Sequence, residues 1–137
     1  MRNYRALTQQ TFKNGEFEIV PIRFEDRFEI MKWRNEQIYH LRQSERLTAE
    51  KQENYFNTSV ASLFNEERPN QILFSFLEGN KCIGYGGLVH INWIDRNAEV
   101  SFLIDSKLEE TRFKLHWGVF LSLIERVAFI GIRFKKI

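Results

Sequence analysis

The sequence predicts a single α/β domain of the α+β kind, in which helices flank a mixed, mostly antiparallel sheet. Three observations support this prediction. The chain has 137 residues, close to the usual length of one domain with one core. Its residues are 43% hydrophobic and 15% aromatic, which is too apolar for a disordered chain. Its apolar residues alternate between strand and helix spacing in the order β-β-α-α-β-β-β-α-β.

A hairpin is expected first. Two strand-like segments, residues 4–12 and 17–22, flank Lys13-Asn14-Gly15-Glu16. Because Asn and Gly both accept positive φ, we predict a tight turn with Asn14 and Gly15 at its centre. Pro21 lacks a backbone donor, so it suits a strand end or a sheet edge.

Two helices are expected next. The first is indicated by apolar side chains at helical spacing, with Glu25 and Asp26 in the first turn, where the helix dipole favours anions. Its inward residues are predicted to be Phe24, Phe28 and Met31, and it is expected to end at Asn35.

The second helix is predicted to begin with Thr48 as its N-cap. Its buried stripe is expected to consist of Phe56, Val60, Leu63 and Phe64. The segment Arg68-Pro69-Asn70 then stops the helix, since proline cannot continue it.

Three strands follow, at residues 71–78, 81–91 and 98–104, the first two joined by a Gly79-Asn80 turn. The second contains Gly84, Gly86 and Gly87, which indicates a bulge or a close approach of another backbone. The third alternates at first and is then wholly apolar, so its end is expected to be buried on both faces.

The last two elements are predicted to be a helix over residues 115–129 and a strand over residues 132–137, with Gly131 between them. The expected inward residues of this helix are Val119, Phe120, Leu123, Ile124 and Val127. Together with the preceding strand they form a right-handed β-α-β crossover. Ligands bind at the helix start of such units, here residues 105–116, and residues 107–137 hold seven basic and three acidic side chains.

Several function classes are excluded by composition. A net charge of +2 lacks the basic excess of a nucleic-acid binder. No apolar run approaches the about 20 residues of a membrane span, and residues 1–10 do not resemble a signal peptide. The single Cys82 fits a reducing, cytoplasmic location, and the scattered His40, His90 and His116 give no metal site.

Three stretches of the sequence form an ordered set: Cys82-Ile83-Gly84-Tyr85-Gly86-Gly87-Leu88, Asn97-Ala98-Glu99-Val100-Ser101-Phe102-Leu103-Ile104-Asp105 and Val127-Ala128-Phe129. Together they resemble the GCN5-related N-acetyltransferases, most nearly the ribosomal-protein N-terminal acetyltransferases. Lys32-Trp33-Arg34-Asn35 is similar to a segment of amino-sugar N-acetyltransferases in the same superfamily. The resemblance covers residues 17–137 and implies an acyl-CoA N-acyltransferase-like fold without its last helix and hairpin.

The resemblance implies direct transfer of an acetyl group from acetyl-CoA to a primary amine, with no metal. The acceptor is a protein N-terminus, an amino sugar or another small amine. In the family, free backbone groups of the strand at residues 98–104 pair with pantetheine. On that alignment the contacts fall on Phe102, Leu103 and Ile104, whose side chains are expected to belong to the core.

The family's pyrophosphate loop reads Gln/Arg-x-x-Gly-x-Gly/Ala, and the matching stretch departs from it. It runs Glu110-Thr111-Arg112-Phe113-Lys114-Leu115-His116-Trp117, with Phe113 and Leu115 near the glycine positions. Side chains there block the approach of phosphate to backbone N–H groups. Arg112 and Lys114 are expected to replace part of that attraction, so the cofactor segment is assigned to residues 112–117.

Glu99 is the candidate catalytic base, because the attacking amine must lose a proton beside the thioester. The alternative is a structural partner across the sheet. Trp33, Arg34 and Asn35 are candidate acceptor-pocket residues. Their alternative is a plain helix end, with Trp33 buried and Asn35 in a left-handed cap.

Two broader alternatives stay open at this point. The chain is either an enzyme or a catalytically degenerate acetyltransferase-like domain that binds a partner. Because family members continue past the strand at residues 132–137, this chain is expected to be truncated or divergent, and to form a homodimer through its C-terminal strand region. Alternatively, the N-terminal hairpin covers that edge and the chain is a monomer.

Overall fold

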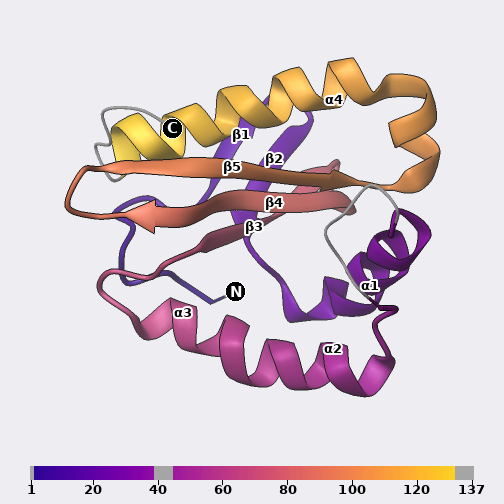
Figure 1. Cartoon of the computed structure of the whole chain (residues 1–137). Coiled ribbons are helices and arrows are strands. Elements are labelled where there is room, and N and C mark those ends of the chain that lie inside the picture. The colour runs from indigo at the N-terminus through magenta and orange to yellow at the C-terminus, as the bar shows by residue number, and fades with distance from the viewer. Residues whose placement is uncertain (1, 39–44, 132–137) are drawn as a thin grey trace.

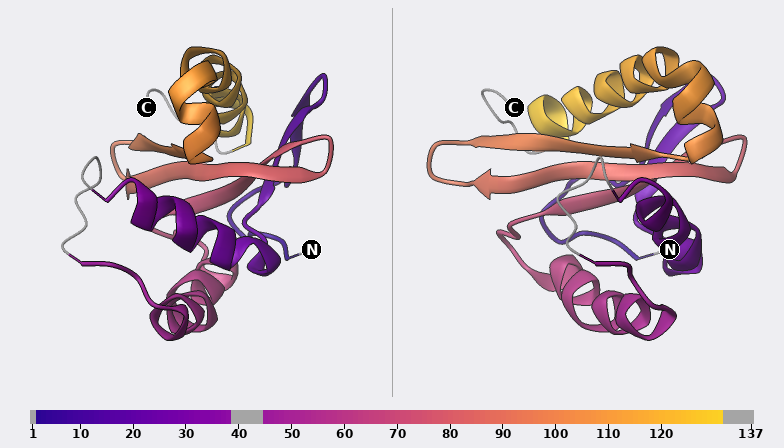
Figure 2. Two further views of the ribbon diagram at one scale, coloured as in Figure 1. Left: turned by 90° about the vertical axis from the view of Figure 1, so that its right-hand side faces the viewer. Right: turned by 45° about the vertical axis from the view of Figure 1, so that its right-hand side comes forward.

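The computed structural model describes residues 2–38 and 45–131. These residues form three layers (Figure 1). An antiparallel sheet forms the middle layer, with neighbours in the order β1-β2-β3-β4-β5. One helix, α4, covers one face, while α1 and the run from α2 to α3 lie on the other side (Figure 2). The strands are β1 (Phe12–Asn14), β2 (Phe17–Pro21), β3 (Ile72–Glu78), β4 (Lys81–Asn92) and β5 (Asn97–Ile104).

The α+β class and the order of elements predicted from the sequence are confirmed for the described residues. The strand expected at residues 132–137, with the crossover and the dimer contact that depend on it, lies outside them. The N-terminal hairpin pairs with β3, so it lies at the opposite side of the sheet from β5. The alternative that the hairpin covers the edge of the C-terminal strand also depends on residues 132–137, so it stays a prediction.

The hairpin differs from its prediction in two ways. Its first strand is confined to Phe12–Asn14, and its turn is Gly15-Glu16, because Asn14 still pairs with Phe17. Gly15 has φ +62° while Asn14 does not have positive φ, which fits a turn with glycine at its first central position. Pro21 is the last residue of β2, as predicted.

The segment before β1 is held by a buried tyrosine instead of a ladder. The Tyr4 hydroxyl donates a hydrogen bond of 2.6 Å to the Leu73 carbonyl and accepts one of 3.0 Å from the Leu73 N–H. Its ring stacks on Phe64 with centroids 4.3 Å apart. The Tyr4 side chain thus anchors this segment to β3, and residues 2–11 form no strand.

The first helix comprises a 3₁₀ turn at Phe24–Asp26 and α1 (Arg27–Glu36). Its buried side chains are Asp26, Ile30, Trp33 and Gln37, at spacings of three and four residues. The predicted inward face is therefore only partly correct, because Phe24 and Met31 are half-buried whereas Phe28 is 40% exposed. Two of the four buried positions are polar, so a search for apolar periodicity alone selects a different face.

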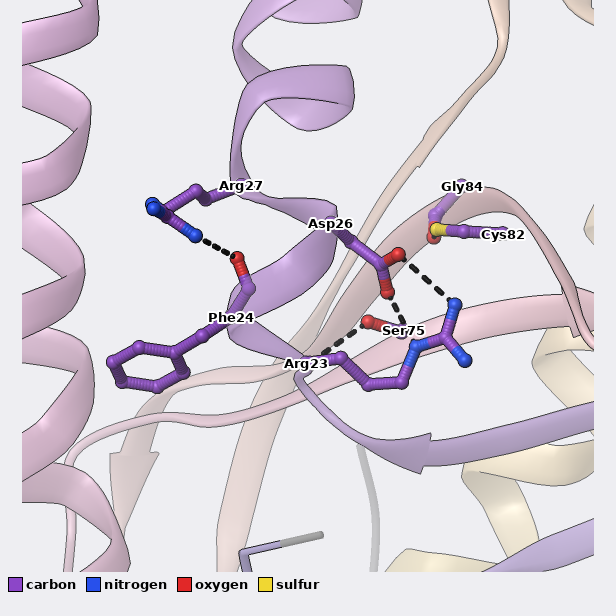
Figure 3. A network of polar contacts seen from close by, with 7 residues as sticks. All are labelled: Arg23, Phe24, Asp26, Arg27, Ser75, Cys82 and Gly84. Carbon is purple, nitrogen blue, oxygen red and sulfur yellow. Dashed lines mark hydrogen bonds and ion pairs between the residues drawn. The ribbon is translucent and has the colours of Figure 1, made fainter.

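The buried carboxylate of Asp26 is paired with Arg23 (Figure 3). Arg23 donates from Nε to Oδ2 over 2.7 Å and from Nη2 to Oδ1 over 2.9 Å. The Arg23 backbone N–H donates to Ser75 Oγ on β3, which ties the start of α1 to the sheet. Beside this pair, burial raises the pKa of the Cys82 thiol to about 12, and its Sγ donates to the Gly84 carbonyl. Cys82 is a protonated, buried residue at neutral pH.

The second helical run comprises α2 (Ala49–Tyr55), a π-helical turn (Phe56–Val60) and α3 (Ala61–Asn65). Thr48 Oγ1 accepts a hydrogen bond from the Lys51 N–H, which confirms the predicted N-cap. The predicted stripe is confirmed as well, since Phe56, Val60, Leu63 and Phe64 are all buried.

The glycines of β4 are confirmed as points of close approach. A Cβ at Gly84 would lie 2.5 Å from the Leu103 carbonyl oxygen, and one at Gly86 would collide with the Ser101 carbonyl oxygen. Side chains are therefore excluded where β4 meets β5. The predicted Gly79-Asn80 turn is also confirmed, with φ +55° and +71°.

Helix α4 (Ser106–Arg126) begins well before the predicted residue 115. Asp105 caps it, because its Oδ1 accepts a hydrogen bond of 3.0 Å from the Lys107 N–H. At Arg112, φ −135° and ψ 27° interrupt the helical path. Most of the predicted inward residues are buried, namely Phe120, Leu123, Ile124 and Val127, whereas Val119 is half-buried.

Aromatic rings fill the layer between the sheet and α4. Phe120 lies with its ring centroid 4.7 Å from Phe102 and 5.3 Å from Phe76. These rings hold α4 against β5 and β3. Within the described segments, no helix is both long and apolar enough to span a bilayer.

Candidate functional site

A cavity of about 480 Å³ lies between the helical layer and the face of β4 and β5 turned away from α4. On the sheet side, cross-strand neighbours share one face, and Tyr85 lies opposite Leu103. Ser101 and Val89 lie farther along the same face. On the helical side, α1 contributes Arg34 and α2 contributes Tyr55.

The remaining polar lining comes from three other residues. Asn70 and Gln71 precede β3, and His90 lies near the end of β4 with φ +50°. The cavity therefore combines an apolar floor with hydroxyl, amide and imidazole groups. Such a mixture is typical of a site that orients a small polar molecule.

The electrostatics of the cavity depend on Arg34 and two tyrosines. Burial raises the pKa of Tyr85, and the nearby Arg34 guanidinium offsets part of that rise. Burial also raises the pKa of Tyr55, again with a smaller opposing effect of Arg34. Both phenols consequently keep their protons at neutral pH and can donate hydrogen bonds.

Glu99, the candidate base, lies at the rim of the cavity. It pairs with Val89 across the sheet, and its side chain is 74% exposed. Its Oε2 lies 3.8 Å from Nε2 of His90, which itself lines the cavity. The carboxylate thus lies next to a residue that lines the cavity but is not itself part of the lining.

The three residues of the Trp-Arg-Asn segment have different environments. Trp33 is buried in the core, as the alternative interpretation expected, and only Arg34 lines the cavity. Asn35 donates from Nδ2 to the Leu47 carbonyl over 2.9 Å and accepts from the Leu47 N–H over 2.7 Å. The left-handed cap expected in that alternative is absent, since Asn35 lies within α1 and the helix ends at Gln37 with φ −108°.

The outer edge of β5 borders the same cavity. The Asp105 N–H donates to the Ile83 carbonyl over 2.7 Å. Because peptide groups along a strand alternate in direction, residues 105, 103 and 101 direct theirs toward β4. Leu103 belongs to this inward set. Phe102 and Ile104 direct theirs to the outer edge, so two of the three residues assigned to pantetheine present backbone groups there.

Gln37 was missed by the sequence analysis. Its buried side chain donates from Nε2 to the Ile104 carbonyl over 2.8 Å and thereby uses one of the two outer-edge carbonyls. Gln37 follows Trp33 by four residues and Ile30 by seven, and this helical spacing could have placed it on the buried face of the helix. Tyr85, Ser101 and His90 were also missed, although Ser101 and Glu99 share a face by simple alternation.

The stretch predicted to be a pyrophosphate loop consists instead of helical turns on either side of a kink at Arg112. Phe113 and Trp117 stack with an interplanar angle of 6°, and Arg112 and Lys114 are exposed at the kink. His116 is buried, and its Nδ1 donates to the Arg112 carbonyl over 2.9 Å. The Asp105 cap lets the helix start at once after β5, where the family pattern has a loop.

The fit of a pyrophosphate to this region is therefore incomplete. The Asp105 carboxylate occupies the helix N-terminus, where an anion would otherwise bind. A shallow hollow of about 410 Å³ at the kink is lined by Glu109 and Glu110 as well as by Arg112 and Lys114. In the described part of the chain, no group of three or more His, Cys, Asp or Glu side chains could hold a metal ion.

A family model described as an acetyltransferase (GNAT) domain matches residues 19–137. No curated protein sequence matches the chain. A chimera of the Vibrio cholerae spermidine N-acetyltransferase SpeG and hSSAT superposes with a TM-score of 0.70 at 15% identity, covering 87% of this chain and 66% of that one. The V. cholerae enzyme in complex with CoA and spermine has a TM-score of 0.66 at 16% identity, covering 85% and 65%.

A dodecameric structure of the V. cholerae spermidine N-acetyltransferase has a TM-score of 0.64 at 17% identity, covering 85% of this chain and 64% of that one. This chain therefore spans slightly less than two thirds of the length of these solved proteins. At such low identity the likeness shows a common fold.

Proposed function

The chain belongs to the GNAT acetyltransferase family, and on that basis we propose that it transfers an acetyl group from acetyl-CoA to a primary amine held in the cavity beside β4 and β5. One observation carries the proposal. Phe102 and Leu103 line the cavity, while the peptide groups of Phe102 face the edge of β5 that is not paired with another strand among the described residues. A donor lying along that edge and an amine inside the cavity would meet at Phe102.

The proposed reaction is a direct attack. The amine nitrogen forms a bond to the thioester carbonyl carbon, the C–S bond then breaks, and CoA leaves as the thiol after taking a proton. The ammonium proton goes to a base on the protein. We assign that role to Glu99, with His90 between its carboxylate and the cavity.

Two features of the solved relatives support this proposal. One of them was determined with CoA and spermine, which is an amine. The shared fold aligns this chain with proteins whose names specify N-acetyl transfer. The acceptor is a protein N-terminus, an amino sugar or another small amine.

A second candidate function is a degenerate domain that binds a partner without catalysis. The observation that favours it is that helical turns, kinked at Arg112, follow directly on Asp105, where the family pattern predicts a phosphate-binding loop. In this alternative, the exposed aromatic surface formed by Phe113 and Trp117 would be used for binding.

Calorimetry with acetyl-CoA, followed by a thiol-release assay with a panel of amines, separates the two candidates. The enzyme proposal expects binding and amine-dependent release of CoA thiol. Replacing both Arg112 and Lys114 by Ala should weaken acetyl-CoA binding at low salt, and the loss should shrink as salt screens these exposed charges. The double variant Lys32→Ala/Lys81→Ala removes the same charge elsewhere and serves as the control. No heat at millimolar acetyl-CoA would favour the binding domain.

A further inference from the structure

The charge of the cavity is unlike that expected for a polyamine site. Among the described residues that line it, Arg34 is the only permanently charged one, and none is Asp or Glu. A polyamine carries several ammonium groups, and a buried ammonium requires a carboxylate or similar partner. The cavity presents a guanidinium to its ligand instead.

Arg34 has no carboxylate partner among the described residues. Its half-buried guanidinium lies beside the protonated phenols of Tyr85 and Tyr55. A guanidinium stays charged at any physiological pH and binds carboxylate or phosphate through paired N–H donors. The two hydroxyls supply neutral donors beside it, which suits an anion.

Two carboxylates lie close to the cavity but are not among its lining residues. Glu99 is at the rim beyond His90, and Glu66 lies in an adjoining hollow that shares Tyr55, Asn70 and Gln71 with the cavity. Residues 39–44 and 132–137 contain no Asp or Glu in the sequence, so they hold no acidic side chain that could reverse the balance.

The cavity also has a direction. Tyr85, near Arg34, pairs with Leu103, whereas Glu99 lies four residues back along β5 opposite Val89. At about 3.3 Å per residue, the Arg34 end of the cavity is therefore about 13 Å along the strand from Glu99, the proposed base. A small acceptor with its anion at Arg34 and its amine beside Phe102 would occupy the Arg34 end of this length.

We propose that the acceptor is an amine that also carries an anionic group, a carboxylate or a phosphate, bound by Arg34, and that it is not a polyamine. This inference rests on the proposed acetyl transfer only for the role of the amine. Binding of the anionic group is a property of the cavity itself and can be measured without turnover.

The test uses matched pairs of probes that differ in the anion. Glucosamine 6-phosphate is compared with glucosamine, phenylalanine with phenylalanine amide, and spermidine serves as the polycation. Binding is measured by calorimetry and acetylation by release of CoA thiol. The proteins are the parent, Arg34→Gln and the control Lys32→Gln, which removes an exposed charge from the same helix. Equal thermal melting of the variants verifies that each one folds.

The expected result is that one anionic probe binds the parent at least about tenfold more tightly than its partner without the anionic group, as a charge-assisted hydrogen bond allows. Arg34→Gln should abolish this preference, and Lys32→Gln should keep it. The pair that shows the preference identifies the anion as phosphate or carboxylate.

Three outcomes would overturn the inference: tighter binding or faster acetylation of spermidine than of the anionic probes, an unchanged preference in Arg34→Gln, or no binding of any probe. Faster acetylation of spermidine, or of an amine without the anionic group, than of the anionic probes would reject the anionic acceptor and keep the acetyl-transfer proposal. Selective binding of an anionic amine without release of CoA thiol would support the anionic ligand and reject the acetyl-transfer proposal.

Discussion

The side-chain amide of Gln37 donates a hydrogen bond of 2.8 Å to the carbonyl oxygen of Ile104, the last residue of β5. The same nitrogen lies 3.2 Å from Ser106 Oγ, and the Ser106 hydroxyl in turn donates to Glu36 Oε1 over 2.8 Å. The end of α1 is therefore tied to the junction of β5 and α4. This junction borders both the cavity and the proposed donor edge.

Replacing Gln37 by Leu should lower the free energy of unfolding by about 1–3 kcal/mol, because the buried Ile104 carbonyl would lose its partner. Urea denaturation measures this change. Gln9→Leu, which removes an exposed hydrogen bond to Thr11, is the matched control and should change stability by less than about 0.5 kcal/mol. Equal effects of the two substitutions would contradict the structural role of Gln37.

Two glycine-to-alanine substitutions should have opposite effects. Gly86→Ala places a Cβ against the Ser101 carbonyl and should destabilise the protein by about 1–3 kcal/mol. Gly118→Ala, within α4 and with open space around its Cβ position, should stabilise it by about 0.5–1 kcal/mol. Thermal or urea melting of both variants is the measurement. A harmless Gly86→Ala would mean that β4 and β5 lie farther apart than described.

Glu99→Gln should lower the turnover number with little change in acetyl-CoA affinity, since the side chain is proposed to accept the proton of the amine. Without this base the reaction depends on amine already deprotonated in solution, so the remaining rate should rise toward higher pH. Steady-state rates across a pH series measure the effect. Rates equal to those of the parent at every pH would make Glu99 a structural residue.

Stability should fall at alkaline pH, in part because of Cys82. Burial raises the pKa of this thiol from 9.0 to about 12 in the folded protein. Between these two values the unfolded chain loses the proton while the folded chain keeps it, so the unfolded state is favoured as pH rises. The stabilisation is complete below pH 9 and is lost progressively up to about 12.

Urea denaturation between pH 8 and about 10.5 measures this dependence, and Cys82→Ala should reduce the slope. Some slope should remain, because burial also raises the pKa values of Tyr4, Tyr55 and Tyr85. Identical slopes for parent and variant would indicate that the thiol titrates normally in the folded protein.

The elements predicted correctly from the sequence are those whose signal is local. The Thr48 cap, the stripe from Phe56 to Phe64 and the Gly79-Asn80 turn each depend on side chains within a few residues, and all three were confirmed. The close approach at Gly86 was also predictable, since glycine inside a strand has few other uses.

The features that were missed depend on contacts between distant segments. Gln37 is buried because Ile104, far along the chain, offers it a carbonyl, and the local sequence records nothing of that partner. Likewise, the inward face of α1 includes Asp26, whose burial requires the neighbouring Arg23 pair and the sheet beneath it. The early start of α4 depends on the Asp105 cap, in a stretch whose charged residues obscure any apolar stripe.

For the cavity, the sequence identified the acidic and basic candidates but not their arrangement. Arg34 and Glu99 were both named, yet only the folded chain places one inside the cavity and the other at its rim. Tyr55 and Tyr85 carried no motif, because a tyrosine on a helix or strand is most often a core residue.

Because the Cys82 thiol is buried, its reaction with a thiol reagent can report how often this part of the protein opens. It is the one cysteine in the sequence, and it lies on β4 beside the Arg23–Asp26 pair that fastens α1 to the sheet (Figure 3). A thiol reagent can reach it only when this region opens, so the labelling rate measures the frequency of that opening. Comparing the rate with global unfolding would show whether the helical layer detaches from the sheet as a separate unit. No cysteine needs to be introduced for this measurement.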